Sequence, residues 1–203
     1  MTKSRNRLNS LLGHLSIMVS KPQTVFFGPY EVTDQVFYHS TFCYGLTNIK
    51  PVLPGHVLVV PFRPALRLTD LTVAEVTDFF TTVQKVQKML ASHYFKKDGL
   101  LGKPEDGSFN IAIQDGKEAG QTVPHLHCHI IPRTRNDQIG DEVYHKLESE
   151  EGNIGGGFYD LKRPAQYGKF PQIEGSIKEP RSQDEMKKEA VIFREMMNLL
   201  ENK

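Results

Sequence analysis

Several short stretches of this chain alternate apolar and polar positions, or are continuously apolar, in the way that is typical of β-strands. Residues 36–38 and 42–44 are short aromatic runs. Residues 56–61 predict a central strand whose alternate members His56, Leu58 and Val60 share one face. Residues 109–114 alternate as a half-buried strand and end at the turn-forming pair Asp115-Gly116, so we expect them to pair antiparallel with the next strand.

Two other segments place their apolar residues three or four positions apart, as in a helix that buries one face. Each begins with a capping box, Thr72 with Glu75 and Ser182 with Glu185. The apolar positions are Val76, Phe79, Phe80, Val83, Val86 and Leu90 in the first helix, and Met186, Ala190, Phe193, Met197 and Leu200 in the second. The first helix is predicted to end near Phe95 and the second to span residues 182–202, both covering one face of the sheet.

Two regions lack such patterns. Residues 135–181 are polar and interrupted by glycines and prolines, and we interpret them as largely a mobile loop without a packed element. Residues 1–25 contain no acidic residue and mix basic residues with serines, which is typical both of a mitochondrial targeting segment and of a disordered basic arm. We therefore expect one domain, over residues 26–203.

Composition narrows the class of protein. The chain has 203 residues and a net charge of +1, so bulk charge gives no reason to expect binding to nucleic acid or to a membrane surface. No apolar run reaches the roughly 18 residues of a membrane span. Two cysteines do not make a disulfide framework. We expect an intracellular location, in the cytoplasm and nucleus, unless the N-terminal segment directs the protein to mitochondria.

Three histidines alternate with apolar residues in the run Thr-Val-Pro-His-Leu-His-Cys-His-Ile-Ile-Pro, residues 122–132. In an extended strand His125, His127 and His129 would share one face, opposite Leu126, Cys128 and Ile130. Neighbouring imidazoles disfavour one another's protonated forms, so at least one should be neutral at working pH. A neutral imidazole is a nucleophile, a general base or a metal ligand.

Ordinary hydrogen-bonding histidines and a zinc site are the alternatives to a catalytic site. Against zinc, the strand contains no acid, and the nearest acid upstream, Glu118, lies in a polar loop. Gln114 and Gln121 are uncharged amide donors, and Gly120 permits close approach of backbone N–H groups to an anion. This set of donors favours a phosphate over a metal.

The run Gly-Gln-Thr-Val-Pro-His-Leu-His-Cys-His-Ile-Ile (120–131) resembles the signature of the histidine triad (HIT) superfamily. Asn-Ile-Lys-Pro-Val-Leu-Pro-Gly-His-Val-Leu (48–58) and Gln-Asp-Gly-Lys-Glu-Ala-Gly-Gln-Thr (114–122) resemble its Fhit branch, the dinucleoside polyphosphate hydrolases, and fungal-type diadenosine triphosphate hydrolases in particular. The resemblance covers residues 27–133 and, more weakly, the C-terminal helix. Pro124 departs from it, because animal members carry a basic residue there.

The resemblance implies an α+β fold, an antiparallel sheet of about five strands with a central helix and a C-terminal helix. It implies that His127 attacks the α-phosphorus and forms a nucleotidyl-histidine, while His125 and His129 hold the tautomer of His127 and donate to phosphate oxygens, and His56 orients the triad. The implied substrate-binding residues are Asn48, Gln114, Gly120, Gln121, Thr122, Val123 and His129, with Phe27, Tyr30, Leu46 and Leu58 around the adenine. It also implies a homodimer and likens Tyr144 to a tyrosine of a flexible loop near the site.

The predicted function is hydrolysis of dinucleoside polyphosphates, with diadenosine triphosphate favoured over the tetraphosphate. No metal would be held by the protein, and Mg²⁺ or Mn²⁺ would accompany the substrate phosphates. A nucleoside phosphoramidase of the same superfamily and a nucleotide-sensing signalling protein, in which the bound complex is the output, are the alternatives. A DNA-adenylate hydrolase of the aprataxin kind would need a Cys/His cluster, which is missing after His145.

Overall fold

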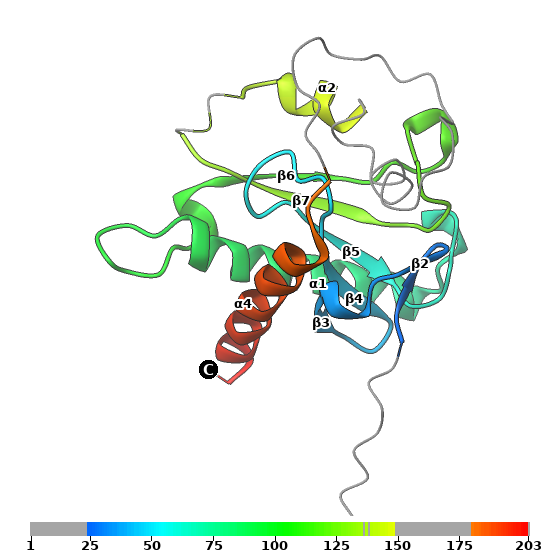
Figure 1. The fold of residues 1–203 in the computed structure, drawn as a ribbon, viewed down its shortest axis with the longest axis horizontal. Helices are drawn as coiled ribbons and strands as arrows, with labels where there is room; N and C mark the ends of the chain where they lie inside the picture. Colours follow the sequence, from blue (N-terminus) through cyan, green and yellow to red (C-terminus); the bar gives the residue numbers. More distant parts are fainter. Residues whose placement is uncertain (1–23, 136, 138, 149–179, 203) are drawn as a thin grey trace, which may run out of the picture.

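A five-stranded antiparallel sheet forms the centre of the fold (Figure 1). The structure is a computed structural model, and it describes residues 24–135, 137, 139–148 and 180–202. The strands lie in the order β3-β4-β5-β7-β6, and β1 and β2 form a separate hairpin. The elements are β1 (Phe26–Phe27), β2 (Tyr30–Glu31), η1 (Thr33–Gln35), β3 (Val36–His39), β4 (Cys43–Thr47), β5 (Val57–Pro61), η2 (Leu68–Asp70), α1 (Val73–Tyr94), η3 (Pro104–Asp106), β6 (Ser108–Ala112), η4 (Lys117–Ala119), β7 (Cys128–Arg133), α2 (Glu142–Glu148) and α4 (Gln183–Glu201).

The α+β architecture predicted from the sequence is confirmed. β5 lies in the middle of the strand order, between β4 and β7, as expected for an apolar run that is buried on both faces. β6 and β7 pair antiparallel, with Phe109 opposite Pro132. The segment that joins them, residues 113–127, contains η4 and the first two histidines.

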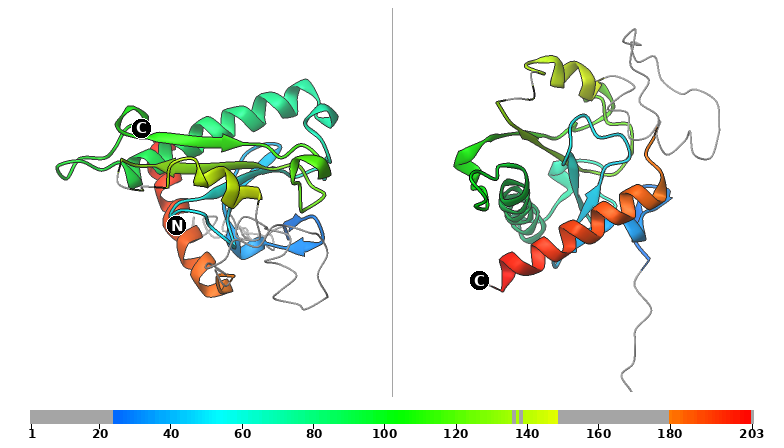
Figure 2. Two further views of the ribbon diagram at one scale, coloured as in Figure 1. Left: turned by 90° about the horizontal axis from the view of Figure 1, so that it is seen from above. Right: turned by 60° about the vertical axis from the view of Figure 1, so that its left-hand side comes forward.

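The two faces of the sheet pack against different elements because successive strand residues point to opposite sides. On one face Val57, Val59 and Ile130 pack with α1. On the other face Leu58 and Val60 pack in a cluster that includes Phe27 and Tyr30 of the β1–β2 hairpin. In Figure 2, α1 lies on one side of the sheet, and the hairpin and α2 lie on the other.

Both capping boxes form as predicted and fix where the long helices begin. The Thr72 hydroxyl accepts from the backbone N–H of Glu75 at the start of α1, and Ser182 does the same with Glu185 at the start of α4. One predicted stripe position is wrong, because Phe80 is 41% exposed at the outer side of α1. The C-terminal helix also does not lie wholly on one face.

α4 reaches the cores on both sides of the sheet. Phe193 and Met197 pack with α1, whereas Met186 belongs to the cluster around Leu58 on the opposite face. α4 contacts the edge strand β3 and η1 as well as α1. It therefore runs past the β3 edge of the sheet, where it can reach the core on either face.

Two sequence expectations are corrected. The histidine segment is not one long strand, since β7 begins only at Cys128 and the backbone N–H of His125 bonds back to the carbonyl of Val123 at 2.7 Å in a tight turn. Within the expected loop, residues 142–148 form α2, because Val143 and Leu147, one helical turn apart, are buried against Ile131. Residues 1–23 and 149–179 lie outside the described residues, so the expectations for the N-terminal arm and most of the loop stay predictions.

None of the helices in the described ranges is long and apolar enough to cross a membrane.

Candidate active site at the histidine triad

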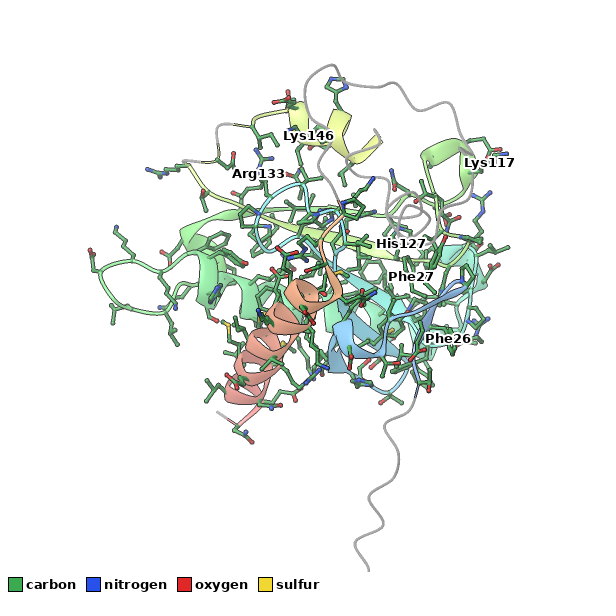
Figure 3. The ribbon with its side chains drawn as sticks, viewed as in Figure 1. Phe26, Phe27, Lys117, His127, Arg133 and Lys146 are labelled. Atoms are coloured by element: carbon green, nitrogen blue, oxygen red, sulfur yellow. The ribbon has the colours of Figure 1, made fainter. Side chains whose placement is uncertain are left out.

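The three histidines lie on the sheet face opposite α1. His129 is the second residue of β7 and pairs in register with Leu58 of β5, while His125 and His127 belong to the segment that leads into β7. All three are buried, at 2%, 1% and 0% exposed in chain order. Figure 3 shows His127 close to Phe27, whose ring lies edge-on to it with centroids 5.1 Å apart. The triad is therefore a desolvated cluster rather than a set of surface histidines.

His125 has both ring nitrogens engaged by the backbone. The N–H of Gly28, in the β1–β2 hairpin, donates to Nδ1 at 3.1 Å. Nε2 lies 2.8 Å from the carbonyl oxygen of Pro61, which can only accept. The proton of neutral His125 is therefore on Nε2, and this imidazole has no lone pair left for chemistry.

His127 is arranged the other way round. Its Nδ1 lies 2.8 Å from the carbonyl oxygen of His125, so Nδ1 carries the proton and donates. In the neutral ring Nε2 is then an unprotonated lone pair. This atom is buried and has no hydrogen-bond partner among the described residues. The hydrogen bonds thus leave His127 Nε2 with a lone pair that no described residue engages, which distinguishes it from the other two histidines in a way that spacing alone could not.

His56 sets the tautomer of His129. The backbone N–H of Val52 donates to His56 Nδ1 at 3.1 Å, so the proton of His56 is on Nε2. His56 Nε2 lies 2.9 Å from His129 Nδ1, which therefore accepts. This leaves the proton of His129 on Nε2, and that buried N–H also has no partner among the described residues. One unoccupied acceptor and one unoccupied donor result.

Burial keeps the triad neutral. Loss of hydration lowers the pKa of His127 to about 4, although the carbonyl of His125 acts in the opposite direction. The pKa of His129 is held well below its usual value, first by burial and then by the charges that His127 and His56 would carry if protonated. The pKa of His125 is lowered by burial as well. The prediction of neutral imidazoles is thus supported by their environment.

Asn48 lies behind the triad, at the far side of His56. Its Nδ2 is 3.1 and 3.3 Å from the two ring nitrogens of His56, and its Oδ1 accepts from the backbone N–H of Lys50 at 2.9 Å. Asn48 is 0% exposed. In this structure the predicted substrate-binding asparagine therefore supports a histidine.

The loop before the triad carries the other predicted substrate-binding residues. Gln114 donates to the carbonyl of Leu147 in α2, and Gln121 donates to the carbonyl of Leu66. Gly120 has φ +88°, and a Cβ there would come within 2.7 Å of Gln114 Nε2, so glycine is needed. The N–H of Gly120 donates to the carbonyl of Lys117 and closes the last turn of η4. In this structure the N–H of Gly120 therefore already has an acceptor.

The remaining predicted residues fall into two environments. Thr122 is half-buried, Pro124 is exposed and Val123 is buried. The four residues assigned to the adenine gather in one buried cluster together with Val123, on the same sheet face as the triad. They are Phe27, Tyr30, Leu46 and Leu58. The structure brings them beside the histidines, and their contact with adenine stays a prediction.

Sequence reasoning missed the backbone groups that fix the tautomers. Backbone groups have no side-chain signature in a sequence, and the groups concerned are the N–H of Gly28, the N–H of Val52 and the carbonyl of Pro61. The glycine at position 28, with φ +55°, is a local sign of an unusual backbone conformation. It also missed Arg181, which donates to the Asn48 carbonyl. A lone arginine before a capping box carries no sequence signal for that role.

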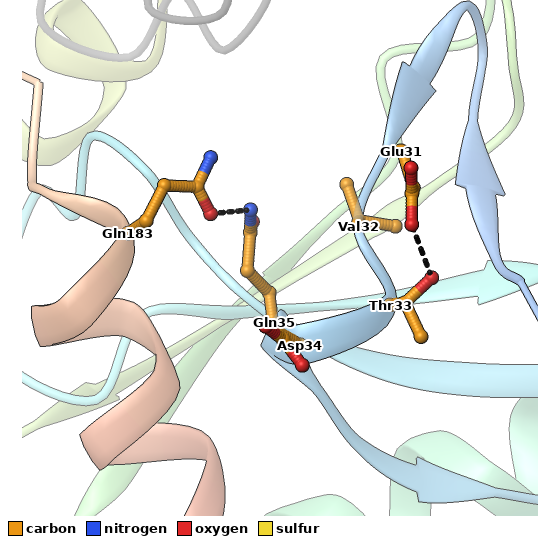
Figure 4. Close-up of a pocket in the computed structure, with 6 residues that line it drawn as sticks. All are labelled: Glu31, Val32, Thr33, Asp34, Gln35 and Gln183. Atoms are coloured by element: carbon orange, nitrogen blue, oxygen red, sulfur yellow. Dashed lines mark hydrogen bonds between the residues drawn. The ribbon is translucent and has the colours of Figure 1, made fainter. Parts of the chain in front are cut away.

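The described residues include no cluster of three or more His, Cys, Asp or Glu side chains arranged to hold a metal ion. A polar hollow of about 300 Å³ lies elsewhere, between η1 and the start of α4, and is lined by Glu31, Val32, Thr33, Asp34, Gln35 and Gln183 (Figure 4). It shares no residue with the triad.

The family model described as "HIT domain" matches residues 30–136. The chain belongs to the HIT domain family. It is 47% identical over 136 residues to bis(5'-adenosyl)-triphosphatase of Saccharomyces cerevisiae, a match that covers 66% of this chain and 60% of that relative. It is 40% identical over 177 residues to asymmetrical bis(5'-nucleosyl)-tetraphosphatase of Schizosaccharomyces pombe, covering 83% and 92%.

Among solved HIT structures, one similar to this chain is the Plasmodium falciparum diadenosine triphosphate hydrolase in complex with cyclomarin A. The TM-score is 0.59 at 27% identity, and the match covers 89% of this chain and 88% of the other. The family suggested by the three sequence blocks, residues 48–58, 114–122 and 120–131, is thereby confirmed.

Proposed function

We propose that this protein hydrolyses dinucleoside polyphosphates to AMP and a nucleoside diphosphate or triphosphate, with diadenosine triphosphate as the preferred substrate and the tetraphosphate as the second. The single observation that carries the proposal is the unprotonated and buried Nε2 of His127, which has no hydrogen-bond partner among the residues that the structure describes. A neutral imidazole lone pair suits attack on phosphorus, and the neighbouring His129 N–H suits stabilisation of the charge that develops on oxygen. The names of the relatives support the same substrate class.

In the first step His127 Nε2 attacks the α-phosphorus in line, the P–N bond forms and the bond to the bridging oxygen breaks. ADP leaves from the triphosphate and ATP from the tetraphosphate. Water then attacks the same phosphorus, breaks the P–N bond and releases AMP. His129 Nε2–H donates to a non-bridging oxygen, and Gln121 and Thr122 serve the bridging and leaving oxygens.

The cation in this proposal arrives with the substrate. With the tautomers above and within the described part of the chain, the triad offers one free lone pair, on His127, whereas protein zinc sites use at least three protein ligands. Mg²⁺ or Mn²⁺ bound to the polyphosphate would neutralise its charge and improve the leaving group. The proposal therefore needs no metal held by the protein.

The test is a substrate panel combined with trapping of the intermediate. The protein is incubated with diadenosine triphosphate, diadenosine tetraphosphate and an adenosine phosphoramidate, and rapid-quench mass spectrometry searches for an adenylylated peptide containing His127. In H₂¹⁸O the label should appear in AMP. Label in ADP would place the attack at the wrong phosphorus, and the lack of an adenylylated peptide during turnover would refute the covalent step.

The same panel separates the alternatives. Preference for the phosphoramidate by more than ten-fold in kcat/KM would indicate a phosphoramidase instead. Tight binding of the dinucleotide with negligible turnover would favour a nucleotide sensor.

Assembly and location complete the proposal. The family resemblance supports a homodimer. Both cysteines are free and buried, which suits a reducing compartment and supports a place in the cytoplasm and nucleus, with mitochondrial targeting by the N-terminal segment as the alternative. Light scattering on the purified protein tests the first, and imaging of a C-terminally tagged chain tests the second.

A further inference from the structure

Arg181, just before α4, forms hydrogen bonds with Asn48 and Ile49, next to His56. Its Nε lies 3.0 Å from the carbonyl oxygen of Asn48, and its Nη2 donates to the same oxygen. Nη2 also lies 2.8 Å from Oε2 of Glu189, one of the acidic residues of α4. The backbone N–H of Arg181 donates to the carbonyl of Ile49 at 3.0 Å. Residues 133 positions apart in sequence are thus held by a guanidinium whose side chain is only 20% exposed.

Asn48 transmits this contact to the triad. Its carboxamide orientation is fixed because Oδ1 accepts from the N–H of Lys50, which directs Nδ2 to the ring of His56. His56 in turn bonds His129 at 2.9 Å and sets its tautomer. A shift of the Asn48 backbone would therefore move His56 and the N–H that His129 presents to the substrate.

We propose that Arg181 is a positioning residue of the active site, acting through Asn48 and His56 on His129. The inference rests on the proposed hydrolase function and adds to it the C-terminal helix, which contributes no residue to the triad. Arginine suits this position because its planar fork can bond one carbonyl with two N–H groups while facing a carboxylate, which a lysine ammonium cannot reproduce.

α4 has contacts with the rest of the fold besides those of Arg181. Gln183 accepts from Gln35 at 3.0 Å, as Figure 4 shows, and Lys187 pairs with Asp34 at 3.1 Å. Met186 and Phe193 are also buried in the core. These contacts hold α4 against the fold. The contact of Arg181 with Asn48 is made in addition to them, and it is directed toward the triad.

The test compares Arg181→Met with Lys187→Met. Each substitution removes one ion pair, at a residue just before α4 or in its first half. For Arg181→Met we expect kcat for diadenosine triphosphate to fall at least ten-fold while KM changes less than three-fold, because the His129 contact strengthens in the transition state. Glu189→Gln should lose about three-fold in kcat by the same route. For Lys187→Met we expect both parameters within two-fold of wild type.

Two further measurements separate positioning from folding. Millimolar guanidinium should restore part of the kcat of Arg181→Ala, whereas equal NaCl should not. Imidazole ¹⁵N NMR shifts of His56 and His129 should change in Arg181→Met and stay constant in Lys187→Met. Should Arg181→Met fold too poorly to measure, Arg181→Lys is used, with a kcat loss of at least three-fold expected.

Wild-type kcat together with unchanged imidazole shifts in the Arg181 variant would overturn the proposal. The NMR arm needs no turnover. If wild-type protein failed to cleave the dinucleotide, the proposed function would fall, and the imidazole shifts would still decide whether Arg181 positions the histidines.

Discussion

At the scale of single residues, the chemistry depends on which nitrogen of each histidine carries a proton. Backbone groups decide this: a carbonyl fixes the proton of His127 on Nδ1, and an N–H fixes the proton of His56 on Nε2. Because these partners belong to the main chain, a side-chain substitution elsewhere does not remove them. The lone pair on His127 Nε2 is therefore a product of the backbone at residue 125, and the N–H on His129 Nε2 follows, through His56, from the backbone at residue 52.

Replacement of His127 tests the assignment of the nucleophile. His127→Ala should reduce kcat on the order of 10⁴-fold or more, because no other described imidazole of the triad has a free lone pair. Steady-state kinetics with diadenosine triphosphate measures the loss, and equilibrium binding of a non-hydrolysable analogue serves as the control for an intact site. Turnover near the wild-type level would show that another group attacks.

The buried imidazoles also predict how stability depends on pH. Below about pH 6.5 the unfolded chain binds a proton on His127, whereas the folded protein binds it only near pH 4. The free energy of unfolding should therefore be highest above pH 6.5 and decrease as the pH falls from 6.5 to 4. His127 alone should contribute a loss of about 3 kcal/mol.

Urea unfolding between pH 4 and pH 8 measures this dependence. His127→Gln should show a shallower decline over the same range, since it cannot bind the extra proton when unfolded. Equal slopes for the two proteins would show that His127 does not contribute.

At the scale of elements, capping boxes position the two long helices, and α1 offers a matched pair of threonines. Thr72 accepts from the N–H of Glu75 and stabilises the first turn. Thr77, on the exposed side of α1, only donates back to the carbonyl of Val73.

We expect Thr72→Ala to lower the free energy of unfolding by about 1 kcal/mol, because the first turn loses its cap. Thr77→Ala should stay within about 0.5 kcal/mol of wild type. Thermal and urea unfolding followed by circular dichroism give both values. A loss for Thr77→Ala as large as that for Thr72→Ala would contradict the capping argument.

At the scale of the whole molecule, α4 joins the two cores that flank the sheet. Phe193 is 1% exposed and packs edge-on to Phe37 of β3 with ring centroids 5.5 Å apart. Its neighbour Ile192 is 47% exposed. Two adjacent residues of one helix thus face the core and the solvent.

Phe193→Ala should destabilise the protein by about 3–5 kcal/mol, because it removes a buried ring and leaves a cavity between α1, α4 and β3. Ile192→Ala should change the free energy of unfolding by less than about 0.5 kcal/mol. Equal effects of the two substitutions in urea unfolding would mean that α4 does not pack as described.

The sequence by itself determined the elements whose cause is local. A continuous apolar run predicted β5, alternation and the turn at Asp115-Gly116 predicted β6 and its pairing with β7, and hydroxyl–carboxylate pairs predicted the starts of α1 and α4. Three motif blocks identified the family and the histidines. These features could be predicted because strand periodicity, helix periodicity and capping each depend on residues a few positions apart.

Only the tertiary structure showed that His127 Nε2 keeps a lone pair that no described residue engages, and which groups hold the triad in place. Gly28 and Pro61 bind His125 from elements that lie 97 and 64 positions away in the chain, and Arg181 reaches Asn48 across 133 positions. Before the late start of β7 at Cys128, the N–H of Leu126 donates to the carbonyl of Ala65, and α2 is buried against Ile131, so these features too depend on residues outside their own segments. Hydrogen bonds to backbone atoms and packing between remote segments leave no periodic trace in a sequence, so they are fixed only when the chain folds.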